Sequence, residues 1–366
     1  MPNNDNRLRI AIDVRALTTQ PTPSGIALYI RQLLHCLAHH KTEIALIPVA
    51  HTRGHYPKDL EAIWPLHVVA AIPGVPWQQI TLPCWARRKH LSYLHGPAFT
   101  LPICAGIPTI VTIHDLTPYI YSGTMRPSTY KYLRIMLPIS LKLATKIFAD
   151  SPEVASDLIR IFKVSQNRIY VIPPPIDTPV ISNIALGNPY LIHPYLLAIA
   201  TQEPRKRLPE LLQAFDVLAT HQHDLHLVIL GKHDSDTGRI TTTLSSLTNK
   251  GRVHVLGYVT QEEKWRWLRN ADALISASIY EGFLMPAIEA MQLRVPVISE
   301  PVGILRAAPK GIYYPYLVAD ASTLVSAVAT IRHGPLEHKT TRLSNAHNWA
   351  MQFQCHNIGR LYLDAL

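Results

Sequence analysis

The sequence lacks the features of a membrane-spanning or secreted protein. No apolar run among its 366 residues approaches the roughly 20 residues that a transmembrane helix needs. The polar residues 1–6 are unlike a signal peptide. Cysteine is scarce, and the C-x-x-C spacing of zinc and redox sites is absent from its four positions, Cys36, Cys84, Cys104 and Cys355. We therefore expect reduced cysteines and a cytoplasmic protein that is at most peripheral at the inner face of a membrane.

Acidic residues are also few. Asp and Glu number 25 against 35 Lys and Arg, which gives a net charge of +10 at pH 7. An excess of positive charge favours an anionic partner. Nucleic acid is an unsuitable partner, because the sequence has no zinc-finger spacing, no RNP-like strand and no uninterrupted basic helix. A nucleotide diphosphate, a lipid phosphate or a membrane surface accounts for the charge equally well.

Short apolar strands alternate with amphipathic helices, which predicts an α/β protein with parallel, helix-covered sheets. Three consecutive prolines, 173–175, cannot lie in a helix or a central strand, so the pattern breaks there. It restarts near Tyr195. We predict Rossmann-like domains at 1–175 and 191–345, joined by a linker at 176–190. The strands are expected at residues 8–14, 43–49, 67–71, 91–94, 109–113, 146–149, 195–200, 225–230 and 253–256.

The most informative segment is 278–291, which follows an apolar strand at 272–277. Pro286 suits the first turn of a helix, where its missing N–H is not needed. Glu281 and Glu289 lie on either side of the turn that opens this helix. Free N–H groups at a helix start attract phosphate, and the two carboxylates can accept hydrogen bonds from hydroxyls. The segment therefore predicts a nucleotide-sugar site.

This segment resembles the E-x7-E signature of retaining GT-B glycosyltransferases of the large mannosyl- and glucosyl-type family, group 1 and family 4-like. The resemblance implies two Rossmann-like domains facing across a cleft, with a C-terminal helix, 346–366, crossing back to the first. It also implies that Glu281 meets the hydroxyls of the transferred sugar and Glu289 the ribose. Phe283, Leu284 and Met285 would line the donor. Leu284 replaces a glycine of the family, and we expect a shifted turn in which Leu284 and Met285 form one apolar wall.

Histidines follow two predicted strands, at His95 and His114. Ligands of doubly wound sheets bind at the carboxyl ends of the strands. The sequence around His114 is close to the family form, which implies that His114 faces the transferred sugar, whereas His95 is as consistent with a structural role. Gly25 matches a phosphate-approaching loop of the family, although Ala27 and Leu28 replace its glycine and arginine.

The loop at 201–207 resembles the family's P-R-K loop. Lys206, at a solvent-accessible helix start, is predicted to hold the departing β-phosphate, and Arg205 to orient the loop. Gly257 and Tyr258 resemble the segment that borders the base. Ala200 stands where the family often has glycine, so one phosphate contact is expected to be missing.

We therefore predict an enzyme with His114, Lys206 and Glu281 as catalytic residues. It would move a hexose, with mannose favoured, from a nucleotide diphosphate sugar, with GDP-sugar favoured, to a hydroxyl acceptor with retention, in surface polysaccharide or glycolipid assembly. No separate cofactor is expected, and no catalytic metal, because no cluster of histidines or carboxylates has metal-ligand spacing. The alternatives are a degenerate, non-catalytic GT-B partner subunit and, with less support, a GT-B sugar epimerase.

The segment 126–146 combines basic and apolar residues. An amphipathic helix here could contact anionic lipid and a lipid-linked acceptor. An ordinary helix with a solvated basic face is the other interpretation. Pro138 is expected to break or kink this helix.

Overall fold

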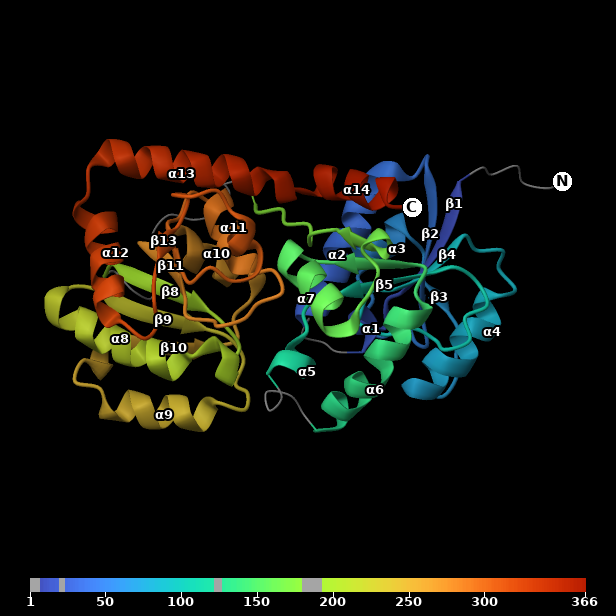
Figure 1. The fold of residues 1–366 in the computed structure, drawn as a ribbon, viewed down its shortest axis with the longest axis horizontal. Coiled ribbons are helices and arrows are strands. Elements are labelled where there is room, and N and C mark those ends of the chain that lie inside the picture. The colour runs from blue at the N-terminus through green and yellow to red at the C-terminus, as the bar shows by residue number, and fades with distance from the viewer. Residues whose placement is uncertain (1–6, 20–23, 122–126, 180–192) are drawn as a thin grey trace. The chain divides into compact units, whose positions relative to one another are not determined.

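The computed structural model describes residues 7–19, 24–121, 127–179 and 193–366 (Figure 1). Most of the predicted linker, and Arg126, lie outside the described residues. The chain divides into two compact units. Unit 1 comprises Met1–Ile120, Arg126–Pro175 and Phe353–Leu366, and unit 2 comprises Tyr121–Met125 and Ile176–Gln352. Each unit contains one parallel sheet with its own hydrophobic core, as the alternating pattern predicts.

Unit 1 holds a seven-stranded sheet in the order β3-β2-β1-β4-β5-β6-β7. Its strands are β1 (Leu8–Asp13), β2 (Ile44–Ala50), β3 (His67–Val68), β4 (Tyr93–Gly96), β5 (Thr109–Ile113), β6 (Lys146–Ala149) and β7 (Ile169–Val171). Its helices are α1 (Arg15–Thr18), α2 (Gly25–Leu37), α3 (Lys58–Ile63), α4 (Leu82–Ala86), α5 (Thr117–Ile120), α6 (Pro127–Leu143), α7 (Pro152–Phe162) and α14 (Cys355–Asp364). The residues of β5 are all buried, because helices cover both faces of a parallel sheet.

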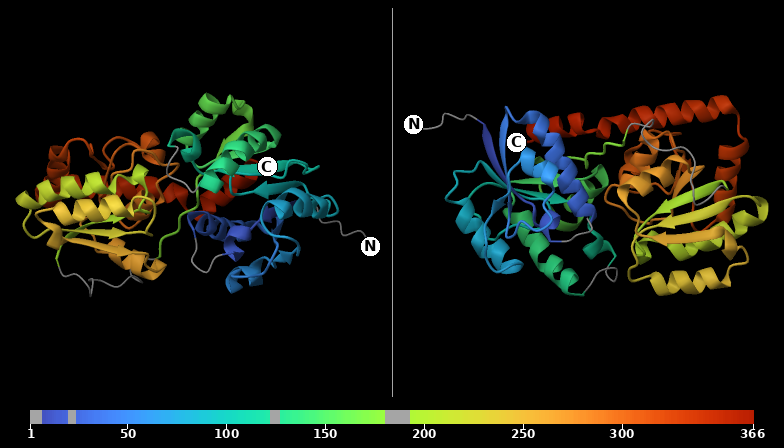
Figure 2. Two further views of the ribbon diagram at one scale, coloured as in Figure 1. Left: turned by 90° about the horizontal axis from the view of Figure 1, so that it is seen from below. Right: turned by 180° about the vertical axis from the view of Figure 1, so that it is seen from behind.

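Unit 2 holds a six-stranded sheet in the order β10-β9-β8-β11-β12-β13. Its strands are β8 (Tyr195–Ile199), β9 (His226–Leu230), β10 (Val253–Gly257), β11 (Ala273–Ser276), β12 (Val297–Ser299) and β13 (Tyr314–Pro315). Its helices are α8 (Leu208–His221), α9 (Thr237–Ser246), α10 (Gln261–Arg269), α11 (Met285–Gln292), α12 (Ala321–His333) and α13 (Leu336–Ala350). Figure 2 shows both sheets from two further sides.

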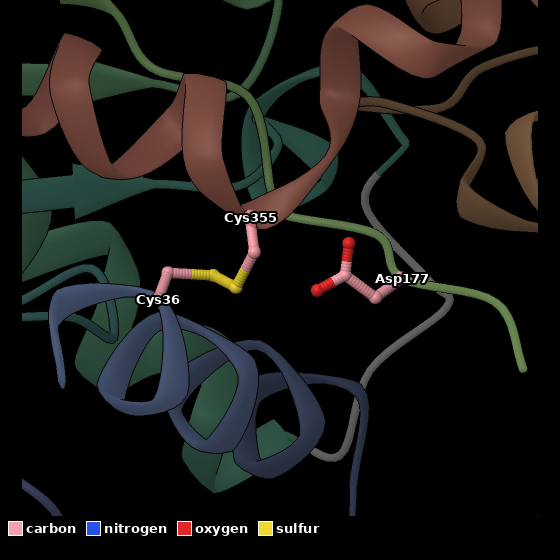
Figure 3. Close-up of side chains that lie close together, drawn as sticks. All are labelled: Cys36, Asp177 and Cys355. Atoms are coloured by element: carbon pink, nitrogen blue, oxygen red, sulfur yellow. A yellow bond between two sulfur atoms is a disulfide. The ribbon is translucent and has the colours of Figure 1, made fainter. Parts of the chain in front are cut away.

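The helix α14 packs on α2 within unit 1, although more than 300 residues separate them (Figure 1). A disulfide joins Cys36 of α2 to Cys355 of α14 (Figure 3). The expectation that all four cysteines are reduced is therefore wrong for this pair. Cysteines so far apart in sequence show no local spacing, and only the packing of the two helices brings them together. Cys84 and Cys104 are free and exposed.

The helix α6 runs without interruption from Pro127 to Leu143. Pro138 lies inside it, so the expected break does not occur. Leu133, Met136 and Leu137 are buried, and packing of this apolar face offsets the hydrogen bond that the proline removes. Within the described residues, no helix is both long and apolar enough to cross a membrane.

Candidate active site

The turn between β11 and α11 places the first predicted carboxylate. Glu281 is 7% exposed, and Phe283 and Leu284 beside it are buried. Leu284 has φ 78° and ψ 57°, the left-handed conformation that glycine adopts readily. The shifted turn that we expected is therefore not formed, although the side chain of Leu284 is buried. Met285 is the first residue of α11, with Pro286 behind it, as predicted.

A glycine that the sequence reading did not single out supports this turn. Gly303 has φ +55°, and a Cβ there would lie 2.7 Å from the carbonyl oxygen of Phe283. Close backbone approach lets Ile304 donate a hydrogen bond from its N–H to the same carbonyl, at 3.0 Å. Any side chain at residue 303 would displace the turn that carries Glu281.

Two cations hold the Glu281 carboxylate, one on each oxygen. Arg205 donates from Nη1 to Oε2 at 2.9 Å, and Lys206 donates from Nζ to Oε1. Both come from the short helical turn Pro204–Lys206 that follows β8, and Ile279 N–H donates to the Arg205 carbonyl at 3.0 Å. The sequence predicted each of these residues as a site residue, and the fold brings them together.

Burial shifts the pKa values of the acid and of the base in this cluster in opposite directions. It works to raise the pKa of Glu281, but the charges of Lys206 and Arg205 lower that pKa to about 2. Burial also lowers the pKa of Lys206, against the opposing effect of Glu281. The Lys206 side chain is only 12% exposed, so the expectation of a solvent-accessible position is wrong. The cluster is a charged, largely desolvated group of the kind found at reactive sites.

Glu289 has a partner that the sequence reading missed. Lys264 donates from Nζ to Oε1 of Glu289 at 2.7 Å. Both side chains are largely buried, at 13% and 5% exposure. The residues lie on α10 and α11, so no local spacing reveals the pair. One signal lies in the sequence: Thr260 followed by Glu263 has the spacing of a capping box, and this cap fixes the turn from which Lys264 projects.

The predicted base-bordering residues lie where β10 ends: Gly257 is its last residue and Tyr258 follows it. Gly257 has φ +71°, and its carbonyl accepts a hydrogen bond from Gly231 N–H at 2.8 Å. Tyr258 is 46% exposed, and the Nζ of Lys232 lies 5.0 Å from the centre of its ring. This leaves an exposed aromatic ring at the carboxyl end of the sheet in unit 2.

His114, in unit 1, is hydrogen-bonded at both ring nitrogens. Nδ1 lies 2.8 Å from Oδ2 of Asp150, and Nε2 lies 2.8 Å from the carbonyl oxygen of Pro97. The rings of Tyr29 and Phe99 meet the imidazole edge to face, at 4.7 and 5.4 Å. Burial works to lower the pKa of His114, but Asp150 and the Pro97 carbonyl raise it above its usual value. The sequence reading missed Asp150, which follows β6.

His95 lies in the core of unit 1 and is fully buried. Its Nδ1 is 3.0 Å from the Tyr362 hydroxyl of α14, and its Nε2 is 2.8 Å from Oγ1 of Thr112. Burial lowers the pKa of His95 to about 3, so the ring is neutral. This geometry supports the structural interpretation of His95.

Gly25 begins α2, where Ala27 N–H is capped by the Ser24 hydroxyl at 3.2 Å. A Cβ at residue 25 would meet no atom within 4 Å. Neither steric crowding nor a positive φ therefore requires glycine at this position in the structure.

Two families match this chain. The family described as "Glycosyltransferase Family 4" matches residues 23–179, and "Glycosyl transferases group 1" matches residues 189–310. Together these segments cover well over half of the chain and fall in its two halves.

Curated relatives match over part of their length. The chain is 29% identical to O-antigen chain mannosyltransferase B of Escherichia coli over 260 residues, which is 68% of this chain and 66% of the relative. It is 28% identical to the MMP alpha-(1->4)-mannosyltransferase of Mycolicibacterium hassiacum, over 44% of this chain and 38% of the relative.

The fold also matches solved structures. HepE of Anabaena in complex with UDP-glucose has a TM-score of 0.73 and 16% identity, and the match covers 98% of this chain and 100% of that protein. At this identity the likeness shows the fold alone. With two parallel Rossmann-like units and both family matches, the chain belongs to the GT-B glycosyltransferases of group 1 and family 4.

Proposed function

We propose that this protein transfers a hexose, of the mannose type, from a nucleotide diphosphate sugar to a hydroxyl acceptor, with retention at the anomeric carbon. The observation that carries the proposal is the buried Glu281 carboxylate held by Arg205 and Lys206 beside the start of α11. The site then combines acceptors for the sugar hydroxyls with donors for the phosphate groups, as a nucleotide sugar requires.

Lys206 would act on the leaving group. An ammonium group has three donors, and Glu281 takes one of them. The other two can meet a diphosphate oxygen as negative charge develops there, next to the positive end of the α11 dipole. Glu281 would hold the sugar hydroxyls, and Glu289 the ribose. In this scheme protein cations stabilise the leaving group, so we propose a metal-independent reaction.

GDP-mannose is the proposed donor, because both relatives described above are named mannosyltransferases. The acceptor would belong to polysaccharide or glycolipid assembly, as the O-antigen name of the Escherichia coli relative suggests. The runner-up donor is UDP-glucose, because HepE, which shares the fold, was solved with that nucleotide sugar.

The test is donor hydrolysis and transfer by purified protein with GDP-mannose, GDP-glucose, UDP-glucose and UDP-galactose, in the presence and absence of EDTA. We expect release of GDP from GDP-mannose, faster with acceptor, and unchanged by EDTA. Turnover of UDP-glucose alone would overturn the donor assignment. Loss of turnover with EDTA would overturn metal independence. Binding of no nucleotide by calorimetry would leave the partner-subunit alternative.

A surface of unit 1 suits a lipid-linked acceptor. Ile80, Ile103 and Ile135 are 64%, 47% and 63% exposed. Hydrogen bonds join their segments: Tyr132 of α6 donates to Gln78 Oε1 at 2.7 Å, and Ile103 N–H donates to Gln79 Oε1 at 2.8 Å. Basic side chains on these segments are exposed, namely Arg87, Arg88, Lys131 and Arg134.

We propose that this surface rests on anionic lipid at the inner face of the membrane, in the cytoplasm, where the nucleotide sugar would be supplied. Vesicles with anionic lipid should sediment the protein, and vesicles of neutral lipid should not. The variant I135S should bind these vesicles less strongly. Equal binding to both kinds of vesicle would contradict an electrostatic contact.

A further inference from the structure

Lys264 projects from a turn of α10 that is fixed independently of its charge. Glu263 N–H donates to Thr260 Oγ1 at 3.2 Å, and Thr260 N–H donates to Glu263 Oε2 at 2.8 Å. Lys264 N–H follows with the first helical hydrogen bond, to the Thr260 carbonyl, at 2.9 Å. The reciprocal cap makes this turn rigid, so the Lys264 side chain leaves the helix from a defined position.

The ammonium group of Lys264 lies in confined surroundings. Its Nζ is 2.7 Å from Oε1 of Glu289 and 3.9 Å from the centre of the Trp265 ring. A cation over an aromatic face is attracted to it, most strongly where water is excluded. The side chain of Lys264 is 13% exposed and that of Glu289 is 5% exposed. Removing one partner of such a buried pair leaves the other charge without compensation, so the two side chains hold each other in place.

The two oxygens of Glu289 are used unequally. Oε1 accepts from Lys264, whereas Oε2 has no hydrogen-bond partner in the described part of the chain. Oε2 is also not one of the fully enclosed side-chain atoms that lack a partner in the described residues. Glu289 therefore holds one oxygen against Lys264 and leaves the other able to accept a hydrogen bond from a ligand.

We propose that Lys264 is a positioning residue for recognition of the nucleotide ribose. It holds Oε1 of Glu289 so that Oε2 is turned to accept from a ribose hydroxyl. The proposal rests on the proposed function, in which Glu289 meets the ribose, and it adds the residue that makes this contact selective. A Glu289 side chain that is rotated away would no longer distinguish a ribose from a deoxyribose by accepting a hydrogen bond from a hydroxyl.

The test compares GDP with 2′-deoxy-GDP and 3′-deoxy-GDP by calorimetry on the full chain. The wild-type protein should bind GDP at least about tenfold more tightly than one of the deoxy nucleotides, as for loss of a hydrogen bond to a charged group. In K264M the GDP affinity should fall about tenfold and the ratio between the nucleotides should approach one. K264R should restore part of the ratio.

A matched control lies on the same helix. Arg266 pairs with Glu262 at 3.6 Å, and Glu262 is 87% exposed. R266M removes a cation from α10 without touching Glu289, so it should keep the wild-type ratio. E289Q, which preserves the shape of the side chain, should lose the ratio as K264M does. In the double variant the two losses should not add, because both act on one contact.

Three results would overturn the inference. The first is a K264M protein that keeps the full ribose preference while it binds GDP more weakly. The second is an E289Q protein with an unchanged ratio, which also serves if K264M does not fold. The third is a wild-type protein that binds GDP and both deoxy nucleotides equally. If the wild-type protein binds none of them, the proposed function fails together with the inference.

Discussion

His114 and Asp150 form a hydrogen-bonded pair at the carboxyl ends of the neighbouring strands β5 and β6, with 2.8 Å between Nδ1 and Oδ2. Nε2 faces the Pro97 carbonyl, which can only accept, so Nε2 carries a proton and donates it. Asp150 and the Pro97 carbonyl favour the charged imidazolium and raise the pKa of His114 above its usual value. The pair lies at the edge of the sheet where ligands of such folds bind.

The D150N variant tests this charge. Removing the carboxylate should lower the pKa of His114, since a neighbouring opposite charge favours the charged form of the ring. A group whose pKa is raised by folding stabilises the fold below its unfolded pKa, near 6.5, and loses this contribution as pH rises through the folded pKa. D150N should therefore lose stability mainly at low pH. NMR titration of the His114 ring measures the shift, and an unchanged pKa would contradict the pairing.

His95 should give the opposite pH dependence. Its pKa is lowered to about 3 in the fold, so the unfolded chain takes up a proton first as pH falls. Below about pH 6.5 this one residue should reduce the free energy of unfolding by about 1.4 kcal/mol per pH unit, until its folded pKa is reached. When unfolding by urea is measured at several pH values, the free energy of unfolding of H95Q should fall less steeply toward acid pH than that of the wild type. H55Q, at an exposed position, should follow the wild-type curve.

Lys206 carries the largest predicted effect on turnover. K206A should reduce the rate by about 100-fold, as for loss of a preorganised contact to a developing charge. Arg205 remains on the other oxygen of Glu281, so the fold should persist. Steady-state rates for K206A and for K250A, which alters an exposed lysine, provide the comparison. A wild-type rate in K206A would remove Lys206 from the reaction.

Leu284 balances backbone strain against burial. A left-handed conformation costs a leucine about 1–2 kcal/mol, which L284G would relieve. Truncating a buried leucine costs about 2–5 kcal/mol, and glycine adds a loss of backbone entropy. L284G should therefore lower the melting temperature. R294G is the matched control, because Arg294 has φ 58° and is exposed, so its replacement should be neutral or stabilising. A higher melting temperature for L284G would show that strain outweighs burial.

The disulfide predicts a redox-dependent stability. C355S, or reduction by dithiothreitol, should cost about 2–5 kcal/mol, since the bond closes a very long loop in the unfolded chain. Thiol titration of the folded protein should find two reactive groups, Cys84 and Cys104, and four after reduction. The C84S variant should melt as the wild type does. Four reactive thiols before reduction would contradict the bond.

Local patterns predicted most strands, because a buried strand is a short apolar run between polar or small residues. The resemblance to the family identified Arg205, Lys206, Glu281 and Glu289. The partners of these residues were harder to predict. Lys264 approaches Glu289 only when α10 and α11 pack, and nothing in the spacing of the two residues encodes that packing. Asp150 could have been predicted from the sequence, because it follows the strand next to the one that His114 follows.

The backbone conformation of the turn at Leu284 was the second feature that the sequence did not predict. The turn at Leu284 keeps the conformation that suits glycine, and the sequence alone could not decide between strain and rearrangement. The answer depends on contacts such as that of Gly303 with Phe283, which lie outside the motif.

Unit 1 contains the C-terminal segment Phe353–Leu366, so the order of synthesis constrains the order in which the two units can fold. Tyr362, the partner of His95, and Cys355, the partner of Cys36, are synthesised only after all of unit 2. Until they emerge from the ribosome, Nδ1 of His95 lacks its hydroxyl partner, and the face of α2 that α14 covers remains open. Unit 2 can therefore complete its sheet during synthesis. Unit 1 is begun first, but it completes its fold only after its C-terminal segment has been synthesised.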